Sequence, residues 1–217
     1  MIRAVIVDVD DTLCLTEAAS FELENDVLAL LGRPPMTREV HLRTWGEPLL
    51  EAMPHRSPGL DLDRFAELFP TVHQQYLADG RLDVIPPENL RALDRLVADG
   101  RSVLLLTSRA EAEVRHLLEP DHALAGRIAG AYHQGNTRFR KPDPRAFDEL
   151  IAQTGHRPEQ CVYVGDSPGD ALAAGGAGIR FVACLQSGVR RLDEFDPRYV
   201  TAAVDTFPEI LPVIGGL

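Results

Sequence analysis

Lysine is nearly absent from this 217-residue sequence: of its 22 basic residues, 21 are arginine and one, Lys141, is lysine. Because lysine presents a compact point charge and arginine a planar fork, the single lysine predicts a position that arginine does not suit. Cysteine is also scarce. Three scattered cysteines without zinc-site spacing are typical of a protein in a reducing compartment, so we expect a cytoplasmic location and no zinc.

Positive charge and long apolar runs are lacking as well. The formal net charge of −11 argues against nucleic acid or an anionic membrane as the main partner. No apolar run approaches the roughly 18 residues of a membrane span. Asp8 and Asp10 interrupt the apolar start, so we expect no signal peptide. The composition, 45% apolar and 25% charged, is that of an ordinary globular protein with room for a small second domain.

Short apolar runs alternate with helical patterns over most of the chain, which predicts an α/β fold with a doubly wound (Rossmann-like) parallel sheet. The expected strands are 2–7, 102–107, 128–132, 161–165, 179–184 and 202–205. Helical spacing alone fills the stretch between the first two strands, with a break at 46–48 and a linker at 54–59. We therefore predict a core of residues 1–14 and 85–217 and an inserted α-helical cap of residues 15–84.

Polar side chains follow four of the expected strands or the loops after them. Since the carboxyl ends of parallel strands meet at one edge of a sheet, these side chains are predicted to share one site. A capping-box spacing also predicts that a helix begins at Ser108 and offers its backbone N–H groups to an anion. The set is Asp8 and Asp10, then Thr107 and Ser108, then Lys141, then Asp166 and Asp170.

Carboxylates, a hydroxyl, backbone donors and an ammonium together suit phosphoryl transfer. The carboxylates would hold a hard cation such as Mg²⁺, which prefers oxygen ligands. Thr107, the Ser108 amide and Lys141 would stabilise the charge on the transferring group. A metal on Asp8 lowers its pKa, whereas neighbouring negative charge raises that of Asp10, so the two acids are predicted to differ in protonation.

Four motifs follow one another along the chain: Asp8-Val9-Asp10-Asp11-Thr12, Leu106-Thr107-Ser108, Lys141-Pro142 and Gly165-Asp166-Ser167-Pro168-Gly169-Asp170. In this order they resemble the motifs of the haloacid dehalogenase-like hydrolase superfamily, in the helical-cap subgroup with phosphoglycolate phosphatase and β-phosphoglucomutase. The resemblance implies that Asp8 attacks phosphorus and becomes an aspartyl-phosphate. Asp10 would protonate the leaving group, later activate water, and bind the metal through its carbonyl.

The same resemblance implies that Asp166 is the other metal ligand and that Asp170 supports this acidic site. Thr107 and Lys141 match the phosphate-binding positions. One departure is Asp11, where many members have glycine. We therefore expect a Mg²⁺-dependent phosphatase of small phosphorylated metabolites.

Several alternatives remain open at this point. A phosphomutase of the β-phosphoglucomutase type shares the same motifs. A receiver-like or purely ligand-binding module is a non-enzymatic alternative, although the order of acids, Thr and Lys differs from that of receivers. A dehalogenase lacks the second acid that Asp10 provides, and a phosphonatase needs a lysine in the insertion, where none exists. The substrate, and whether the chain is a monomer or a homodimer, are left open.

The insertion is predicted to close over the site, with hinges at 14–17 and 82–86, and to recognise the leaving group. Arg43, Trp45 and Glu17 are its candidate substrate-binding residues. Each has a plainer interpretation, because Trp45 has core spacing and Arg43 fits a solvated face. Arg109 is interpreted either as a contact for a second substrate charge or as a surface residue of its helix.

Overall fold

The computed structural model describes residues 1–217, and the chain folds into two compact units. The first, called here the core unit, comprises Met1–Cys14 and Ile85–Leu217. The second, the inserted unit, comprises Leu15–Val84. The inserted unit therefore interrupts the core unit directly after its first strand and the acidic turn.

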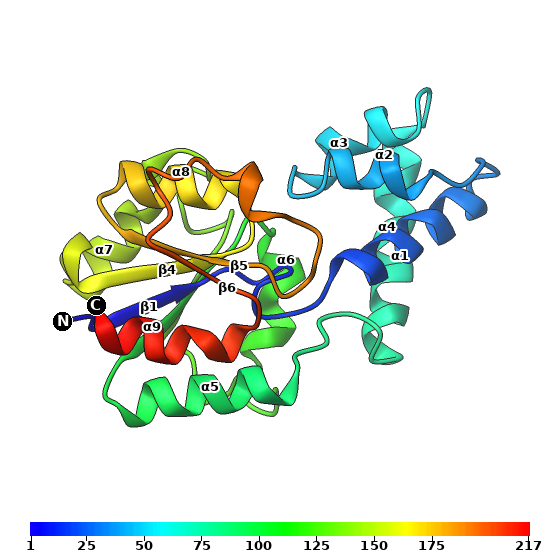
Figure 1. Cartoon of the computed structure of the whole chain (residues 1–217). Coiled ribbons are helices and arrows are strands. Elements are labelled where there is room, and N and C mark those ends of the chain that lie inside the picture. The colour runs from blue at the N-terminus through cyan, green and yellow to red at the C-terminus, as the bar shows by residue number, and fades with distance from the viewer. The chain divides into compact units, whose positions relative to one another are not determined.

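The core unit is built on one six-stranded sheet in the order β3-β2-β1-β4-β5-β6, in which every pair of neighbours is parallel (Figure 1). The predicted fold class, a doubly wound parallel α/β sheet, is confirmed. The strands are β1 (Ala4–Val7), β2 (Ser102–Leu106), β3 (Gly130–Tyr132), β4 (Cys161–Gly165), β5 (Arg180–Cys184) and β6 (Ala202–Val204).

Helices cover both faces of this sheet, as the alternation of side chains along a strand requires. Val5 and Val7 pack on the face covered by α5 (Pro87–Ala98) and α9 (Ile210–Gly216) (Figure 1). Ala4 and Ile6 pack on the face covered by α7 (Asp148–Thr154) and α8 (Pro168–Gly176). Shorter elements are α6 (Glu111–Val114) and the 3₁₀ turns Arg115–Leu118, Pro144–Phe147, Pro158–Gln160, Leu192–Glu194 and Phe207–Glu209.

Strand β1 lies at the centre of the sheet, where the chain order reverses between β1 and β4. Its last residue, Val7, pairs with Leu105 of β2 and Val164 of β4. The residues that follow these three strands therefore emerge side by side. A reversal of strand order opens a crevice at the carboxyl ends of the strands, which is the usual ligand position in sheets of this kind.

The inserted unit is helical, as predicted from its spacing. It contains α1 (Glu17–Leu30), α2 (Arg38–Arg43), α3 (Leu49–Arg56) and α4 (Leu62–Ala78), and its own apolar core includes Leu23, Val27, Met53 and Phe65. Its two ends are tied together, because the N–H of Leu15 donates to the carbonyl of Val84 at 3.0 Å.

Two local predictions are wrong. The helix after β2 begins at Glu111 with Ala110 as its cap, so Ser108 lies in a bend instead of at a helix start. The Glu113 carboxylate accepts from the N–H of Ala110 at 2.8 Å, and this capping bond sets the later start. The predicted linker at 54–59 begins too early, since α3 continues to Arg56 through Pro54. Burial of Met53 and Arg56 outweighs the helix hydrogen bond that Pro54 cannot make.

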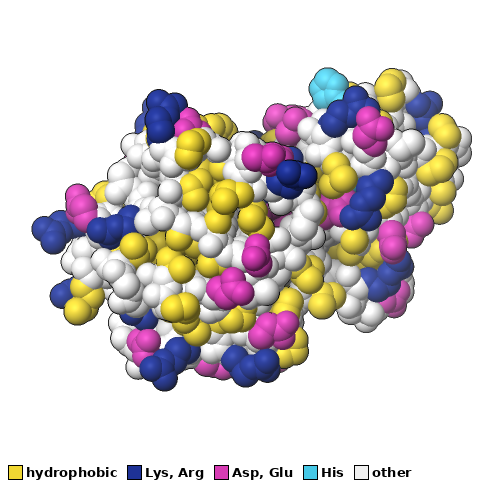
Figure 2. Space-filling view, in the orientation of Figure 1, with side chains coloured by type: hydrophobic (Ala, Val, Ile, Leu, Met, Phe, Trp, Pro, Cys, Tyr) yellow, Lys and Arg dark blue, Asp and Glu magenta, His cyan; other side chains and the backbone are white.

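Basic and acidic side chains are interspersed on the face drawn in Figure 2, with apolar side chains between them. Many exposed arginines lie beside acids close in sequence, as in the pairs Arg145–Asp143 at 2.6 Å and Arg198–Asp196 at 2.6 Å. None of the helices is both long and apolar enough to cross a membrane.

Candidate active site

Asp8 lies immediately after β1, and its surroundings hold it firmly in place. Its N–H donates to the carbonyl of Val164 in β4 at 2.9 Å, and the residue is 5% exposed. The chain then turns tightly, with the N–H groups of Leu13 and Cys14 both donating to the carbonyl of Val9. Asp11 within this turn adopts a left-handed φ of 53°, which aspartate tolerates better than most residues. The position where many members of the resembled family carry glycine therefore has a backbone role here.

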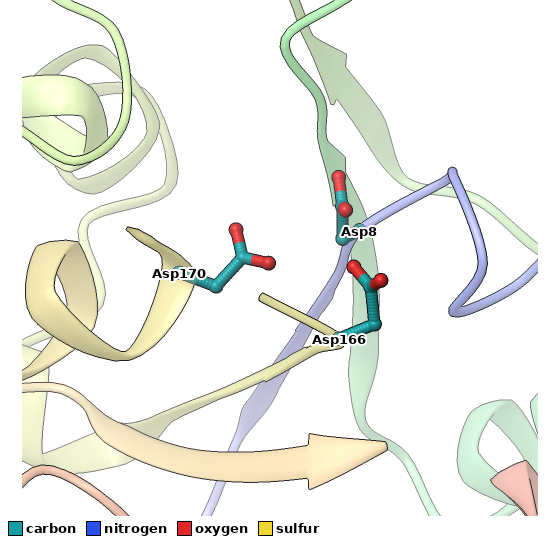
Figure 3. Close-up of side chains that lie close together, drawn as sticks. All are labelled: Asp8, Asp166 and Asp170. Carbon is teal, nitrogen blue, oxygen red and sulfur yellow. The ribbon is translucent and has the colours of Figure 1, made fainter. Parts of the chain in front are cut away.

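Three buried carboxylates converge at the end of the sheet (Figure 3). Asp8 follows β1, Asp166 follows β4 and Asp170 lies in the first turn of α8, and their carboxylate oxygens lie within 4.8 Å of one another. A Cβ on Gly165 would lie 2.7 Å from Oδ2 of Asp170, so the close approach of Asp170 to the strand requires glycine there. Ser167 fixes Asp170 further, since its hydroxyl donates to Oδ2 at 2.7 Å.

Lys141 places its ammonium between two of these carboxylates. Its Nζ lies 2.9 Å from Oδ1 of Asp8 and 2.6 Å from Oδ1 of Asp170, and it donates to the hydroxyl of Tyr163 at 2.8 Å. The side chain is 9% exposed. A single ammonium reaching three partners in a confined space is the arrangement that a planar guanidinium fits poorly, which agrees with the choice of lysine in an arginine-rich chain.

The site is buried and carries more negative than positive charge, and both features shift the pKa values of its groups. Burial raises the pKa of Asp8 from 3.8 to about 7, opposed by Lys141 and assisted by Asp170 and Asp10. Burial, Asp170 and Asp8 raise the pKa of Asp166 well above its ordinary value. Burial favours the neutral form of Lys141, but the charges of Asp170 and Asp8 outweigh it and raise its pKa. One ammonium does not balance three acids in this space.

The donor set fits a hard divalent cation. It consists of three buried carboxylates, offers only oxygen atoms, and carries a negative charge that a cation would offset. Asp8 and Asp166, from neighbouring strands, are the two of these acids that the sequence motifs place as ligands. Asp170 is hydrogen-bonded to Ser167 and paired with Lys141, so it is placed to support the site.

The residues predicted to bind phosphate come together on the core unit. Thr107, Ser108 and Lys141 line one small pocket, whose other lining residues are Leu106, Gln134, Thr137, Phe139, Arg140 and Ala146. Thr107 is buried, and its hydroxyl accepts from the N–H of Arg109 at 3.2 Å. Gln134 donates its side-chain amide to the carbonyl of Ser108, which holds the bend after β2.

The side chain of Asp10 is directed to Arg109, a direction that the sequence does not reveal. Arg109 donates from Nε to both carboxylate oxygens, at 3.2 and 3.0 Å, and from Nη2 to Oδ1 at 2.6 Å. The interpretation of Arg109 as a mere surface residue is therefore wrong, because its side chain is 11% exposed and it holds an acid of the motif.

Glu17, Arg43 and Trp45 all lie in the inserted unit. Glu17 is buried and pairs with Arg38 and with His41, so it has a structural role inside that unit. The Arg43 side chain is 67% exposed and pairs with Glu39 at 3.4 Å. Trp45 packs its ring against that of His41, with centroids 5.1 Å apart. Substrate binding by these three residues stays a prediction.

Tyr163 is the site residue that sequence reasoning missed. It lies in β4 among apolar residues, and its hydroxyl accepts from Lys141 while donating to Oδ1 of Asp170 at 2.9 Å. It also lies 3.3 Å from the carbonyl of Leu106. The one available signal was a phenol within a run of aliphatic residues, since a buried tyrosine hydroxyl normally has a partner.

A fold of this kind, with acids after β1 and β4 and a lysine between them, defines a class of hydrolases. The family model of haloacid dehalogenase-like hydrolases matches residues 5–184, and the chain belongs to that family. The predicted family is thus confirmed. The chain is an enzyme of this hydrolase family, which decides against the receiver-like and purely ligand-binding alternatives.

Relatives and solved structures agree with this assignment. Phosphoglycolate phosphatase 1 of Pseudomonas aeruginosa is 28% identical over 97% of this chain and 79% of its own length. Phosphoglycolate phosphatase of Rhodospirillum rubrum is 32% identical over 84% of this chain and 79% of its own length. The crystal structure of CbbY from Rhodobacter sphaeroides in complex with phosphate is 21% identical, covers 97% of both chains and superposes with a TM-score of 0.79, which shows the shared fold.

Proposed function

We propose that this chain is a Mg²⁺-dependent phosphatase of small phosphorylated metabolites, of the phosphoglycolate phosphatase kind, with Asp8 as its nucleophile. The observation that carries the proposal is the position of the Asp8 carboxylate. It is buried at the reversal point of the sheet, 2.9 Å from Lys141 and beside Asp166. The relatives named phosphoglycolate phosphatase support the substrate class.

In the first half of the reaction, a carboxylate oxygen of Asp8 attacks phosphorus. The new bond joins Asp8 to phosphorus, and the bond from phosphorus to the leaving oxygen breaks. Asp10 gives its proton to that oxygen, which departs as an alcohol. Thr107 and Lys141 stabilise the charge on the transferring phosphoryl group through hydrogen bonds made in a largely buried site.

In the second half, water attacks the phosphorus of the aspartyl-phosphate. The water gives a proton to the Asp10 carboxylate, the bond between phosphorus and Asp8 breaks, and inorganic phosphate leaves. Both carboxyl groups are then back in their starting forms. Asp8 and Asp166 would hold Mg²⁺, and the bound cation would supply positive charge between the anionic nucleophile and the anionic substrate.

A panel of phosphorylated metabolites tests the proposal. We expect purified protein with Mg²⁺ to release inorganic phosphate from short phosphate monoesters, and chelation of divalent cations to stop the release. The phosphomutase alternative predicts an isomeric sugar phosphate in place of free phosphate. Release of no phosphate from any member of the panel, with several divalent metals, would contradict the proposed function.

A further inference from the structure

The ion pair between Arg109 and Asp10 occupies the core unit beside the phosphate-binding turn. Both carboxylate oxygens of Asp10 accept from Nε of Arg109, and Nη2 adds a shorter contact of 2.6 Å to Oδ1. Nη1 donates to the carbonyl of Glu113 at 3.2 Å, which orients the guanidinium plane. The guanidinium of Arg109 is therefore already oriented to bind a carboxylate through two of its nitrogens.

The backbone ties this fork to the phosphate-binding residues. Arg109 is two residues after Thr107, and its N–H donates to the Thr107 hydroxyl at 3.2 Å. A group that sits on the fork therefore lies only a few atoms from a phosphoryl group at Thr107. A small ligand that carries a phosphate at one end and a planar anion at the other can reach both.

The two partners differ in their access to solvent. The side chain of Arg109 is 11% exposed, whereas that of Asp10 is 30% exposed. Asp10 is the more accessible partner of the pair. An incoming anion therefore approaches the guanidinium of Arg109 from the side that Asp10 occupies in this structure. Arginine binds carboxylates bidentately, and one carboxylate can take the place of another on the same fork.

We infer that Arg109 determines substrate specificity by binding a carboxylate on the leaving group, which displaces Asp10 from the guanidinium. The inference rests on the proposed function and narrows its substrate class to phosphate esters of short hydroxy acids. The same exchange frees the Asp10 side chain from the guanidinium, so binding of the substrate carboxylate and the position of Asp10 are coupled. A phosphate ester without a carboxylate does not displace Asp10, which stays paired with Arg109.

The test compares two substrates that differ only in this group, namely 2-phosphoglycolate and 2-hydroxyethyl phosphate, which has an uncharged hydroxymethyl group in place of the carboxylate. The wild-type protein is expected to prefer 2-phosphoglycolate by about 10- to 100-fold in kcat/KM, because only the substrate with a carboxylate can form the bidentate ion pair with Arg109. Arg109→Gln is expected to bring this ratio close to one, mainly through a higher KM for 2-phosphoglycolate.

Two further variants keep the result interpretable. Arg109→Lys retains the charge and loses the fork, and its ratio is expected to fall between those of the wild type and Arg109→Gln. It also replaces Arg109→Gln if thermal unfolding shows that the latter does not fold. Arg115→Gln is the matched control, because Arg115 is 66% exposed and pairs with Glu111 outside the site; its ratio should equal that of the wild type.

The outcomes separate this inference from the proposed function. An unchanged ratio in folded Arg109→Gln or Arg109→Lys, or equal use of the two substrates by the wild type, overturns the role of Arg109 and leaves the phosphatase proposal intact. Failure of the wild type to hydrolyse any phosphate monoester overturns both.

Discussion

The core unit buries acids in excess, whereas the inserted unit buries acids that are matched by bases. In the core unit, Asp8, Asp166 and Asp170 share the one ammonium of Lys141. Burial first, and then the neighbouring acids, raise the pKa values of Asp8 and Asp166, so each carboxyl resists ionisation in that setting. Three acids and one ammonium leave this cluster with an excess of negative charge.

The inserted unit holds a buried cluster of similar size. Nη1 of Arg56 donates to both oxygens of Glu24 at 2.7 Å, and its Nε donates to the Thr44 hydroxyl at 2.8 Å. His41 is fully buried, with its ring nitrogens 3.5 Å from Glu17 and 3.4 Å from Glu24. Within the unit, Glu24 thus has the cationic partner Arg56, and Glu17 has the cationic partner Arg38.

The difference separates two uses of buried charge. A balanced cluster ties helices together and contributes specificity to the fold. An unbalanced cluster of acids with perturbed pKa values is what a site for a cation and an anionic substrate requires. Burial of charge alone therefore does not distinguish the candidate active site from the buried cluster of the inserted unit. The excess of buried negative charge does distinguish it.

The largest expected effect is the loss of turnover in Asp8→Asn. Replacing the nucleophile should lower kcat by at least about 10⁴-fold, as measured by phosphate release. Asp10→Asn should come close to this loss, because it removes the acid–base group. Retention of more than a few per cent of the wild-type rate in Asp8→Asn would contradict the assignment of the nucleophile.

Asp8→Asn also changes the pH dependence of stability in the metal-free protein. The folded pKa of Asp8 is raised from 3.8 to about 7, so the folded state binds this proton more tightly than the unfolded state does. Its favourable contribution is complete below 3.8 and is lost as the pH rises through about 7. Thermal unfolding over this range should show a flatter pH profile in Asp8→Asn than in the wild type, and identical profiles would argue against an acid in excess.

In the inserted unit, Glu24→Gln is expected to act on stability. It leaves the buried guanidinium of Arg56 without its counter-ion and should lower the free energy of unfolding by about 3 kcal/mol, as measured by denaturant titration. Glu22→Gln is the matched control on the same helix, because Glu22 is 60% exposed in its pair with Arg81. The control should cost less than about 1 kcal/mol. An equal loss of unfolding free energy in Glu24→Gln and Glu22→Gln would show that the buried pair of Glu24 and Arg56 contributes no more to stability than an exposed pair.

Lys141→Arg tests the need for a point charge. The guanidinium should fail to reach Asp8, Asp170 and the Tyr163 hydroxyl together, and kcat should fall by about 10²-fold. The measurement is phosphate release at saturating substrate. A rate close to that of the wild type would count against Lys141 as a ligand of the transferring phosphate.

The smallest expected effect is that of Tyr163→Phe. Loss of the hydroxyl between Lys141 and Asp170 should cost about 1.5–3 kcal/mol in stability, because the lost hydrogen bonds involve charged groups. Tyr132→Phe is the control, since its hydroxyl donates to the uncharged Gln153 at 3.1 Å in a less buried position. An equal loss of stability in Tyr132→Phe would show that charged partners add nothing to the stabilisation provided by the Tyr163 hydroxyl.

Much of this site was predictable because parallel strands bring their carboxyl ends together. Runs of apolar residues predicted β1 and β4. The acids that directly follow these strands, Asp8 and Asp166, were therefore expected to lie together at the same edge of the sheet. The direction of Asp10 was not predictable, since it depends on Arg109, which is 99 residues away in the chain. Tyr163 was hidden by its apolar neighbours, and its role needs the register of three strands.

The helix start after β2 shows a different limit. Ser108 and Glu113 both offer capping chemistry, and the local sequence does not decide which one is used. The structure uses Glu113, which leaves Ser108 in the bend that Gln134 holds. Local capping signals therefore compete, and tertiary contacts select among them.

The most direct test of the central claim, that phosphoryl passes through Asp8, is the steric course of the reaction. Hydrolysis of a phosphorothioate monoester, made chiral at phosphorus by sulfur and two oxygen isotopes, in water of the third oxygen isotope gives chiral inorganic thiophosphate, whose configuration reports the number of displacements at phosphorus. Transfer to Asp8 and then to water consists of two in-line displacements and predicts net retention of configuration. Net inversion would show that water attacks the substrate directly, and it would contradict the aspartyl-phosphate on Asp8.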